Sequence, residues 1–365
     1  MLNGSLPQSV VNFRGPLVRD LLAAGHRVTA VAPDITPEIA AQIEALGATP
    51  HEVPLQRGGT NPLSDFGYYH ALRGLIAEIA PDLVLSYTIK PNIWGSLAAK
   101  ARGVRSASMV TGLGYTFIQR ETWKQRLIGG ISRQLYARAT AANDVVVFQN
   151  ADDRQDFIDA GCLADGSKAR MVNGSGVDLD HYALAPLSEK PVFLMVARLL
   201  VSKGVREYAE AAMRVMGLRD DCRFVLAGDL DATPDSVTAD ELAHWRDQGI
   251  EHLGWLDDVR GAMAEASVYV LPSYREGTPR TVLEASAMGR ASIVTDAPGC
   301  RETVKDGETG LLVPVRDIDA LERAMLTMAD DSQLRAKAVA AARRYCEEKY
   351  AVGKVNRQLM DHLGL

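Results

Sequence analysis

Residues 268–287 read V-Y-V-L-P-S-Y-R-E-G-T-P-R-T-V-L-E-A-S-A, and the interpretation of the whole chain starts from this stretch. Its first four residues form an apolar, β-branched run that is typical of a buried strand. A loop follows, and then a helical pattern begins in which Pro279 suits the first turn. Two carboxylates, Glu276 and Glu284, lie on either side of the predicted helix start. The stretch therefore predicts a strand–loop–helix unit with an acid on the loop and another on the helix.

Such a unit has a physical use that follows from its geometry. A helix start presents N–H groups and a partial positive charge, which suit a phosphate. Glu276 is placed to reach a sugar hydroxyl from the loop, and Glu284 to accept hydrogen bonds from a vicinal diol such as a ribose. Taken alone, the two glutamates are better explained as a capping acid and a solvated helix acid than as a binding pair.

Six further segments narrow the interpretation, because together with E-G-T-P-R-T-V-L-E they resemble the retaining glycosyltransferases of family 4. That family carries an E-x7-E motif and has the GT-B fold, and the resemblance runs from Asn12 to the C-terminus. It is closest to bacterial enzymes that build polysaccharide repeat units or lipid-linked oligosaccharides. The other matching segments are N-F-R-G-P-L (12–17), T-I-K-P-N-I-W-G (88–95), T-G-L-G-Y-T-F (111–117), A-R-L-L-V-S-K-G (197–204), G-W-L-D-D-V-R (254–260) and T-D-A-P-G-C-R-E-T-V (295–304).

Length and composition are those of a soluble two-domain protein. A chain of 365 residues exceeds one ordinary core. No apolar run reaches the ~18–20 residues that span a bilayer, and the N-terminus lacks the charged and apolar regions of a signal peptide. The four cysteines are too far apart for a zinc motif, so we expect reduced thiols in a cytoplasmic protein.

Charge is unevenly distributed along the chain. The net charge is -6, yet residues 90–138 carry nine Lys or Arg and one Glu, which gives +8. A concentrated basic surface on an acidic protein indicates an anionic membrane or an anionic acceptor. Nucleic acid is disfavoured, because no nucleic-acid-binding motif accompanies the charge.

Alternating strand and helix patterns predict an α/β protein with doubly wound parallel sheets. The resemblance implies two Rossmann-like domains that face a cleft. We expect an acceptor and membrane domain over 1–185, a nucleotide-sugar domain over 186–348, and a terminal helix over 349–365 that packs back on the first domain. Only Met1–Ser5 precede the first loop. Either the first strand is very short or the given start lies late.

The acceptor side of the cleft is assigned to residues that follow predicted strands or open helices. A helix is expected over 17–24, with Arg14 and Gly15 where its N-terminus faces the cleft. The strand over 82–87 ends in T-I-K-P-N, and ligands bind beyond the carboxyl ends of such strands. This places Lys90 and Asn92 at the cleft mouth. Lys90 is either an acceptor-phosphate contact or a solvated loop lysine.

Thr111 and Gly112 complete the predicted acceptor side. Many family members carry a cleft-facing histidine in this region, but the sequence here is T-G-L-G. We therefore assign no protein base.

A long helix predicted over 121–139 is basic and amphipathic. A stripe of apolar residues alternates with basic ones, and this pattern indicates either membrane docking or an ordinary half-buried helix with a basic face. The stripe consists of Trp123, Leu127, Ile131 and Leu135.

The donor side rests on the resemblance. Arg198 and Lys203 match the basic pair that grips the donor diphosphate and stabilises it as it leaves. By the same resemblance, Gly228 and the segment 255–259 are expected to lie on either side of the nucleotide's base. The remaining expected donor contacts are Glu276, Gly277, Thr278, Pro279 and Glu284. Three D-x-D triplets, beginning at Asp178, Asp229 and Asp317, are interpreted as non-metal.

The sequence therefore predicts a retaining, metal-independent transferase that needs no cofactor. It moves a sugar from a nucleotide-sugar, expected to be a UDP-sugar, to an undecaprenyl-diphosphate-linked saccharide at the cytoplasmic face of the inner membrane. The leaving phosphate is expected to assist the incoming hydroxyl. Two alternatives stay open: a GT-B nucleotide-sugar epimerase, and a catalytically silent nucleotide-sugar-binding scaffold.

Overall fold

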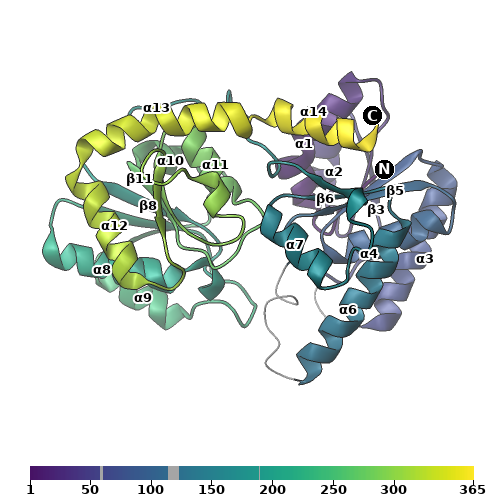
Figure 1. The fold of residues 1–365 in the computed structure, drawn as a ribbon, viewed down its shortest axis with the longest axis horizontal. Coiled ribbons are helices and arrows are strands. Elements are labelled where there is room, and N and C mark those ends of the chain that lie inside the picture. Colours follow the sequence, from purple (N-terminus) through teal and green to yellow (C-terminus); the bar gives the residue numbers. More distant parts are fainter. Residues whose placement is uncertain (58–60, 114–122, 189) are drawn as a thin grey trace. The chain divides into compact units, whose positions relative to one another are not determined.

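The computed structural model describes residues 1–57, 61–113, 123–188 and 190–365. It consists of two compact units (Figure 1). Unit 1 contains residues 1–175 and 353–365, and unit 2 contains residues 176–352. The chain therefore leaves unit 1 once and returns to it once. Next to these two crossings, Val177 forms a parallel bridge with Ala351 inside unit 2.

Unit 1 is built on a seven-stranded sheet in the order β3-β2-β1-β4-β5-β6-β7, and every pairing is parallel. The strands are β1 (Leu2–Asn3), β2 (Thr29–Ala32), β3 (Thr49–Glu52), β4 (Leu83–Tyr87), β5 (Arg105–Val110), β6 (Val145–Phe148) and β7 (Ala169–Met171). The helices of this unit are α1 (Pro7–Ala23), α2 (Pro37–Ala45), α3 (Pro62–Ile79), α4 (Ile89–Lys100), α6 (Trp123–Ala142), α7 (Ala151–Asp159) and α14 (Val352–Leu363). A 3₁₀ turn, η1, covers Gly166–Lys168.

Apolar side chains alternate between the two faces of this sheet. Ala30 and Leu85 belong to the cluster beneath α1, α2 and α14, whereas Val31 and Val84 belong to the cluster beneath α3 and α4. This alternation follows from the two-residue period of a strand. Both faces are therefore covered by helices, as parallel sheets require.

The first strand is very short, and it lies in the middle of the sheet. Leu2 pairs with Ala30 of β2 and with Leu85 of β4. The fully buried Asn3 accepts a hydrogen bond from the Tyr68 hydroxyl at 2.8 Å and donates one to the Ser86 hydroxyl at 3.3 Å. The buried side-chain amide of Asn3 thus forms hydrogen bonds through both its oxygen and its nitrogen.

Two helices of unit 1 begin at other residues than the sequence predicted. The helix expected over 17–24 begins at Pro7, so Arg14 and Gly15 lie inside α1 and not at its N-terminus. The helix has Pro7 at its first position and keeps Pro16, next to the expected start, in its interior. The segment expected to be a strand end is the first turn of α4, where Pro91 is tolerated because first-turn N–H groups need no helical partner.

Unit 2 is built on a six-stranded parallel sheet in the order β10-β9-β8-β11-β12-β13. The strands are β8 (Val192–Val196), β9 (Arg223–Ala227), β10 (Glu251–Gly254), β11 (Val268–Leu271), β12 (Ala291–Thr295) and β13 (Gly310–Val313). The helices are α8 (Val205–Leu218), α9 (Ala239–Asp247), α10 (Arg260–Glu265), α11 (Arg280–Ala287), α12 (Ile318–Asp330) and α13 (Ser332–Lys349). Two 3₁₀ turns, η2 (Val201–Lys203) and η3 (Arg301–Thr303), follow β8 and β12.

The C-terminal helix α14 packs on unit 1. Its buried residues Val355, Leu359 and Leu363 belong to the same apolar cluster as Leu17 and Val18 of α1. Polar contacts add to this packing: Asn356 Nδ2 donates to Asp20 Oδ2 at 2.7 Å, and Arg105 Nη2 donates to the Leu363 carbonyl at 3.0 Å.

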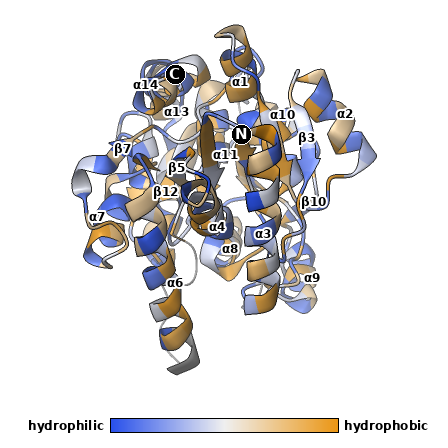
Figure 2. Ribbon diagram, turned by 90° about the vertical axis from the view of Figure 1, so that its right-hand side faces the viewer, coloured by the Kyte–Doolittle hydropathy of each residue, from blue (hydrophilic) through white to orange (hydrophobic). Residues whose placement is uncertain are grey.

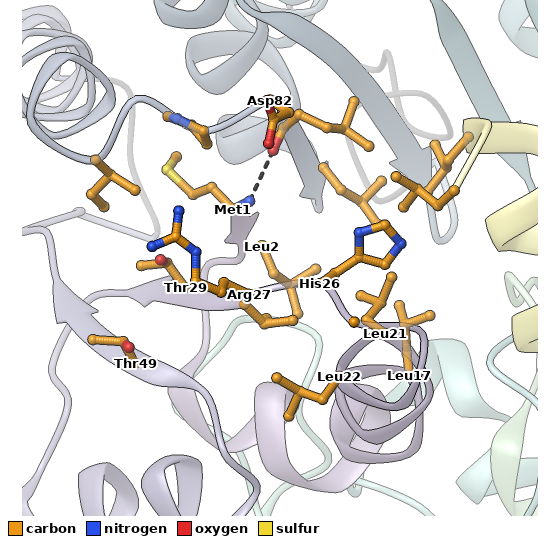
Figure 3. A pocket seen from close by; sticks show the side chains of 18 of the residues that line it. Met1, Leu2, Leu17, Leu21, Leu22, His26, Arg27, Thr29, Thr49 and Asp82 are labelled. Atoms are coloured by element: carbon orange, nitrogen blue, oxygen red, sulfur yellow. Dashed lines mark hydrogen bonds between the residues drawn. The ribbon is translucent and has the colours of Figure 1, made fainter.

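A cavity of about 480 Å³ opens at the amino ends of the central strands of unit 1 (Figure 3). The Met1 amino nitrogen donates to the Leu83 carbonyl at 2.8 Å beside it, and Leu17, Leu21 and Leu363 are among its lining residues. Ligands of open parallel sheets bind at the opposite edge, beyond the carboxyl ends of the strands. We therefore assign no substrate to this cavity.

Helix α6 carries exposed apolar side chains along part of its length. Leu127 is 57% exposed and Ile131 is 53% exposed, and Figure 2 shows apolar and polar residues alternating along the helix. The exposed Arg126 and Arg138 lie on the same helix. Within the described ranges, no helix is long and apolar enough to cross a membrane.

Candidate functional site

The predicted donor residues of unit 2 follow the carboxyl ends of β8 and β11. These strands are neighbours, and β8 is the first strand of the unit while β11 is the fourth, so the strand order reverses between them. Such a reversal leaves a crevice at the carboxyl edge of an open parallel sheet. The loop after β8 carries Arg198 and Lys203, and the loop after β11 carries Glu276. The topology therefore brings together side chains that are far apart in sequence.

Lys203 and Glu276 form an ion pair at this edge. The Lys203 ammonium lies 2.5 Å from Glu276 Oε1, and the two side chains are 23% and 14% exposed. The loops that carry them are also joined through the backbone, because the Tyr274 N–H donates to the Ser202 carbonyl at 2.9 Å. A cation and a carboxylate are thus held side by side, each still reachable from solvent.

The backbone of Glu276 is fixed by the loop after β12. The N–H of Glu276 donates to the Pro298 carbonyl at 2.9 Å. Gly299, the residue after Pro298, has a φ of +79°. A Cβ at position 299 would lie 2.1 Å from the Glu276 carbonyl oxygen. Only glycine allows these two loops to approach so closely. The glycine of the P-G-C-R segment therefore serves the placement of Glu276.

Arg198 lies in the loop between β8 and η2 and pairs with Asp231. Its Nη1 is 3.0 Å from Asp231 Oδ2, and 60% of its side chain is exposed. Asp231 is itself held by the Thr233 N–H, which donates to its second carboxylate oxygen at 3.0 Å. A guanidinium keeps further N–H donors when one nitrogen is engaged. Arg198 can therefore contact an anion while Asp231 holds it.

Glu284 lies one turn inside α11, as the helical pattern predicted, but it is buried and is not a solvated helix acid. Arg280 Nε donates to Glu284 Oε1 at 2.7 Å, and Glu284 is 5% exposed. Burial raises the pKa of the Glu284 carboxyl, while Arg280 and a hydrogen bond from Tyr182 act in the opposite direction. The carboxylate is therefore a desolvated acceptor whose charge is compensated by its own neighbours.

The residues expected to bracket a base lie at the ends of β9 and β10. Gly228 has a φ of +138°, and a Cβ there would lie 1.8 Å from the Ala197 carbonyl oxygen. Its N–H donates to the Gly254 carbonyl at 2.8 Å, and His252 Nε2 contacts its carbonyl oxygen at 2.8 Å. Trp255 follows with an exposed indole. The backbone of Gly228 thus lies next to that of Ala197 and Arg198.

The other predicted donor residues lie between Glu276 and α11. Gly277 and Pro279 are buried and Thr278 is half-buried, and Pro279 is the residue before the first turn of α11. Their roles as donor contacts stay predictions.

Some predicted acceptor-side residues of unit 1 already have partners within the unit. Arg14 is buried, and its guanidinium carbon lies 5.0 Å from the centre of the Tyr87 ring. The Lys90 ammonium lies 2.7 Å from Asp65 Oδ1 and donates to the Gln56 carbonyl at 2.8 Å. Lys90 is therefore neither a solvated loop lysine nor on a loop, and its acceptor contact stays a prediction.

Asn92 is more clearly part of the interior. It is fully buried in α4, and its Nδ2 donates to the Met109 carbonyl of β5 at 2.9 Å. Gly15 is also buried, inside α1. Both residues are buried within unit 1, and their acceptor-side roles stay predictions.

Thr111 and Gly112 follow the carboxyl end of β5, where both are half-buried. Gly112 has a φ of +135°, which favours glycine. Residues 114–117 of the same motif lie outside the described residues, as do the side chains of Trp123 and Lys124 on the predicted basic helix.

The three D-x-D triplets have local roles. Asp317 accepts from the Ala320 N–H and caps α12, Asp178 accepts from the His181 N–H, and Asp231 pairs with Arg198. Among the described residues, no three His, Cys, Asp or Glu side chains gather as a metal-binding group. The metal-independence of the site stays a prediction, because a metal held partly by a substrate needs fewer protein ligands.

Sequence reasoning did not assign Arg280, Tyr182 or Asp231 to the site. The contact of Arg280 with Glu284 could have been predicted, since Arg280 precedes Glu284 by four residues on a helix. Tyr182 and Asp231 come from other segments, and their contacts with Glu284 and Arg198 depend on tertiary packing.

Comparisons with known proteins give a consistent assignment for both units. A family model described as "Glycosyl transferase 4-like domain" matches residues 12–173, and one described as "Glycosyl transferases group 1" matches residues 190–331. The chain is 26% identical over 342 residues to the N,N'-diacetylbacillosaminyl-diphospho-undecaprenol alpha-1,3-N-acetylgalactosaminyltransferase of Campylobacter jejuni, covering 90% of this chain and 88% of the relative. It is 29% identical over 278 residues to the UDP-Gal:alpha-D-GlcNAc-diphosphoundecaprenol alpha-1,3-galactosyltransferase of Escherichia coli, covering 72% and 70%.

Solved structures share the whole architecture. HepE of Anabaena in complex with UDP superposes with a TM-score of 0.79 at 15% identity, covering 100% of this chain and 98% of the other. The sucrose-phosphate synthase of Thermosynechococcus elongatus superposes with a TM-score of 0.79 at 18% identity, covering 99% and 94%. At this level of identity the likeness concerns the fold.

Proposed function

Because the chain belongs to the glycosyltransferase family defined by these two domain models, we propose that it transfers a sugar from a UDP-sugar to an undecaprenyl-diphosphate-linked saccharide. Its two parallel-sheet units have the GT-B fold, as the sequence predicted. The prediction of a glycosyltransferase is confirmed, and the epimerase alternative is not supported, since the two relatives described above are transferases. Both are named for undecaprenol-linked diphosphosugar acceptors, which supports the proposed acceptor.

The observation that carries the proposal is the Lys203–Glu276 ion pair, with Arg198 on the same segment after β8 as Lys203. Lys203 and Glu276 meet at the carboxyl edge of β8 and β11, where the strand order reverses. Two cations suit a diphosphate, and a carboxylate that is partly exposed suits the hydroxyls of a sugar. The site therefore offers complementary groups to both halves of a nucleotide-sugar.

The proposed mechanism assigns one role to each group. The bond between the sugar C1 and the diphosphate oxygen breaks, and Arg198 and Lys203 stabilise the negative charge that develops on the leaving UDP. A bond then forms between C1 and the acceptor hydroxyl oxygen on the same face of the sugar. The acceptor proton passes to the leaving phosphate oxygen. Glu276 holds the sugar hydroxyls, and Glu284 holds the ribose.

We expect uridine nucleotides to stabilise the protein without a divalent metal. A ligand that binds only the native state at a hundredfold excess over its Kd contributes about 2.7 kcal/mol, which corresponds to a melting-temperature rise of roughly 5–10 °C for a domain of this size. Differential scanning fluorimetry with UDP, GDP and a panel of UDP-sugars, each with and without EDTA, measures this shift. A shift with UDP that EDTA leaves unchanged supports the proposal and ranks the donors. A shift that EDTA removes contradicts the metal-free site, and no shift with any nucleotide contradicts the donor site itself.

The acceptor implies work at a membrane surface, and α6 is the surface we propose for it. It carries the exposed Leu127 and Ile131 together with the exposed Arg126 and Arg138. Apolar side chains enter the interface between headgroups and acyl chains, while arginines attract anionic headgroups. We infer a peripheral association with the cytoplasmic face of the cell membrane.

The double variant Arg126→Gln/Arg138→Gln should bind anionic vesicles more weakly than the wild type. Each basic residue near an anionic surface contributes about 1 kcal/mol, so a loss of roughly thirtyfold in partition is expected. Co-sedimentation with vesicles of phosphatidylglycerol and phosphatidylethanolamine measures it. The matched control is Arg170→Gln/Arg357→Gln, which removes two exposed arginines of unit 1 outside α6. Equal losses in both variants would contradict a specific role for α6.

A further inference from the structure

Glu284 differs from the other acids of the site because it is buried. Its carboxylate is 5% exposed, and Arg280 Nε donates to Oε1 at 2.7 Å. The Tyr182 hydroxyl also acts to lower the pKa of this carboxyl. A buried carboxylate keeps its charge only when neighbours replace the hydration that it lost. Arg280 and Tyr182 are the residues that supply this replacement from protein side chains.

The two neighbours come from different segments that are fixed relative to α11. Arg280 is the first residue of α11, one turn before Glu284, so its side chain lies along the same helix face. Tyr182 lies in the segment that follows the crossing into unit 2. Arg343 of α13 ties this segment to α11, since its Nη1 donates to the Tyr182 carbonyl at 3.1 Å and to the Ala287 carbonyl at 2.9 Å. Arg343 therefore fixes the backbone of Tyr182 relative to the C-terminal end of α11.

A ribose diol places a specific demand on this carboxylate. Two vicinal hydroxyls donate to two oxygens only if both oxygens are unprotonated and point the same way. A protonated Glu284 would lose an acceptor, and a rotated one would lose the geometry. The charge of Arg280 opposes protonation, and its directional hydrogen bond opposes rotation.

We propose that Arg280 and Tyr182 are positioning residues that keep the Glu284 carboxylate charged and aimed at the ribose diol of the nucleotide. This inference rests on the proposed function, since it assigns the ribose to Glu284. It adds to the donor site two residues that act through Glu284. It also makes Arg280, the arginine of E-G-T-P-R, a determinant of ribonucleotide binding.

The charged and titratable groups around Glu284 define the pH behaviour that follows. Arg280 lies on its own helix, Tyr182 and His181 lie on the segment after the crossing, and Tyr269 lies on β11. Burial already raises the pKa of Glu284, and Arg280 opposes that rise. Removing Arg280 raises the pKa further. Binding that needs the charged carboxylate is then lost at a higher pH as the solution is acidified.

The test compares two nucleotides on the same variants by isothermal titration calorimetry. The ligands are UDP and 2′,3′-dideoxyuridine 5′-diphosphate, which lacks both ribose hydroxyls. Arg280→Met should weaken UDP binding at least tenfold and change the binding of the dideoxy nucleotide less than threefold. Tyr182→Phe, which removes one hydroxyl, should give the same pattern with a smaller loss. Arg323→Met, an exposed arginine of α12, is the matched control and should change neither.

The outcomes separate this inference from the proposed function. If Arg280→Met weakens both nucleotides equally, Arg280 contacts the diphosphate directly or acts on folding, and the inference is overturned. Unchanged UDP binding in both variants also overturns it. A wild-type protein that binds no UDP overturns the proposed function instead. The UDP titration is then repeated from pH 5 to pH 8, because a merely structural role of Arg280 would not change the pH dependence of affinity. In Arg280→Met, the loss of affinity on the acid side should shift to higher pH. In Arg280→Lys, the pH profile should return toward that of the wild type.

Discussion

Glu276→Gln should lower kcat by about 10²–10³-fold while the protein remains folded. The substitution keeps the size of the side chain and removes its charge. Glutamine accepts fewer hydrogen bonds from sugar hydroxyls and no longer orients the Lys203 ammonium, which lies 2.5 Å from the carboxylate in the wild type. The effect on kcat arises because both interactions act at the centre where the sugar–phosphate bond breaks. Release of UDP from a UDP-sugar in the presence of a lipid-linked acceptor measures it.

The stability of this variant is expected to change little. An ion pair that is still partly exposed contributes about 0–1 kcal/mol, so the melting temperature should fall by only a few degrees. The matched control is Glu308→Gln, which breaks an exposed pair with Lys305 at 3.6 Å and should keep the wild-type kcat. A Glu276→Gln enzyme with wild-type turnover would remove the role assigned to this residue.

Lys203→Ala should lower kcat/KM for the donor by a similar factor, about 10²–10³-fold, through the other half of the same pair. The lost ammonium no longer neutralises the leaving diphosphate, and Glu276 is left as an uncompensated charge next to an incoming dianion. Both consequences oppose donor binding and bond breaking. Steady-state kinetics with varied UDP-sugar, together with UDP titration, separates the two.

Two further variants make this result specific. Lys203→Arg keeps the charge but changes its shape, so it should recover UDP binding more fully than turnover. Arg206→Ala removes an exposed cation of α8 that pairs with Glu241 at 2.6 Å, and it should behave as the wild type. If Lys203→Ala and Arg206→Ala lower kcat/KM equally, a general loss of positive charge explains the effect and the assignment to the diphosphate is wrong.

The sequence predicted most of the fold because strands and helices carry their own periodicity. β11 (Val268–Leu271) is the apolar, β-branched run that predicted a buried strand, and all four of its residues are buried. The errors concern where two helices begin. The helix expected over 17–24 begins at Pro7, so Pro16 lies inside α1, and the T-I-K-P-N segment expected at the end of a strand forms the first turn of α4. Proline is tolerated in the first turn of a helix, so Pro91 does not prevent α4 from beginning there.

For the candidate site, the sequence predicted the residues that lie in motifs but not the residues that contact them. Arg198, Lys203, Glu276 and Glu284 were predicted because each lies in a segment that resembles the family, and their roles stay predictions. The side chains that pair with Arg198 and Glu284 in the structure were not predicted. Asp231 belongs to a D-x-D triplet that was interpreted as non-metal, and the structure places its carboxylate 3.0 Å from Arg198. Tyr182 lies in a segment with no motif, and its contact with Glu284 depends on how that segment folds against α11. Such contacts between distant segments are not encoded in any local pattern.

The two crossings between the units have a consequence for engineering. Unit 2 is a continuous insertion of residues 176–352 into unit 1, and Val177 and Ala351 pair at its base. A chimera that exchanges this insertion as one block, with both ends cut beside the Val177–Ala351 bridge, leaves α14 on the host whose surface it covers. A graft that instead transfers everything after residue 175 brings a foreign α14 to the host and breaks its contacts with Asp20 and Arg105. Donor preference should therefore be transplanted as an internal cassette and not as a C-terminal half.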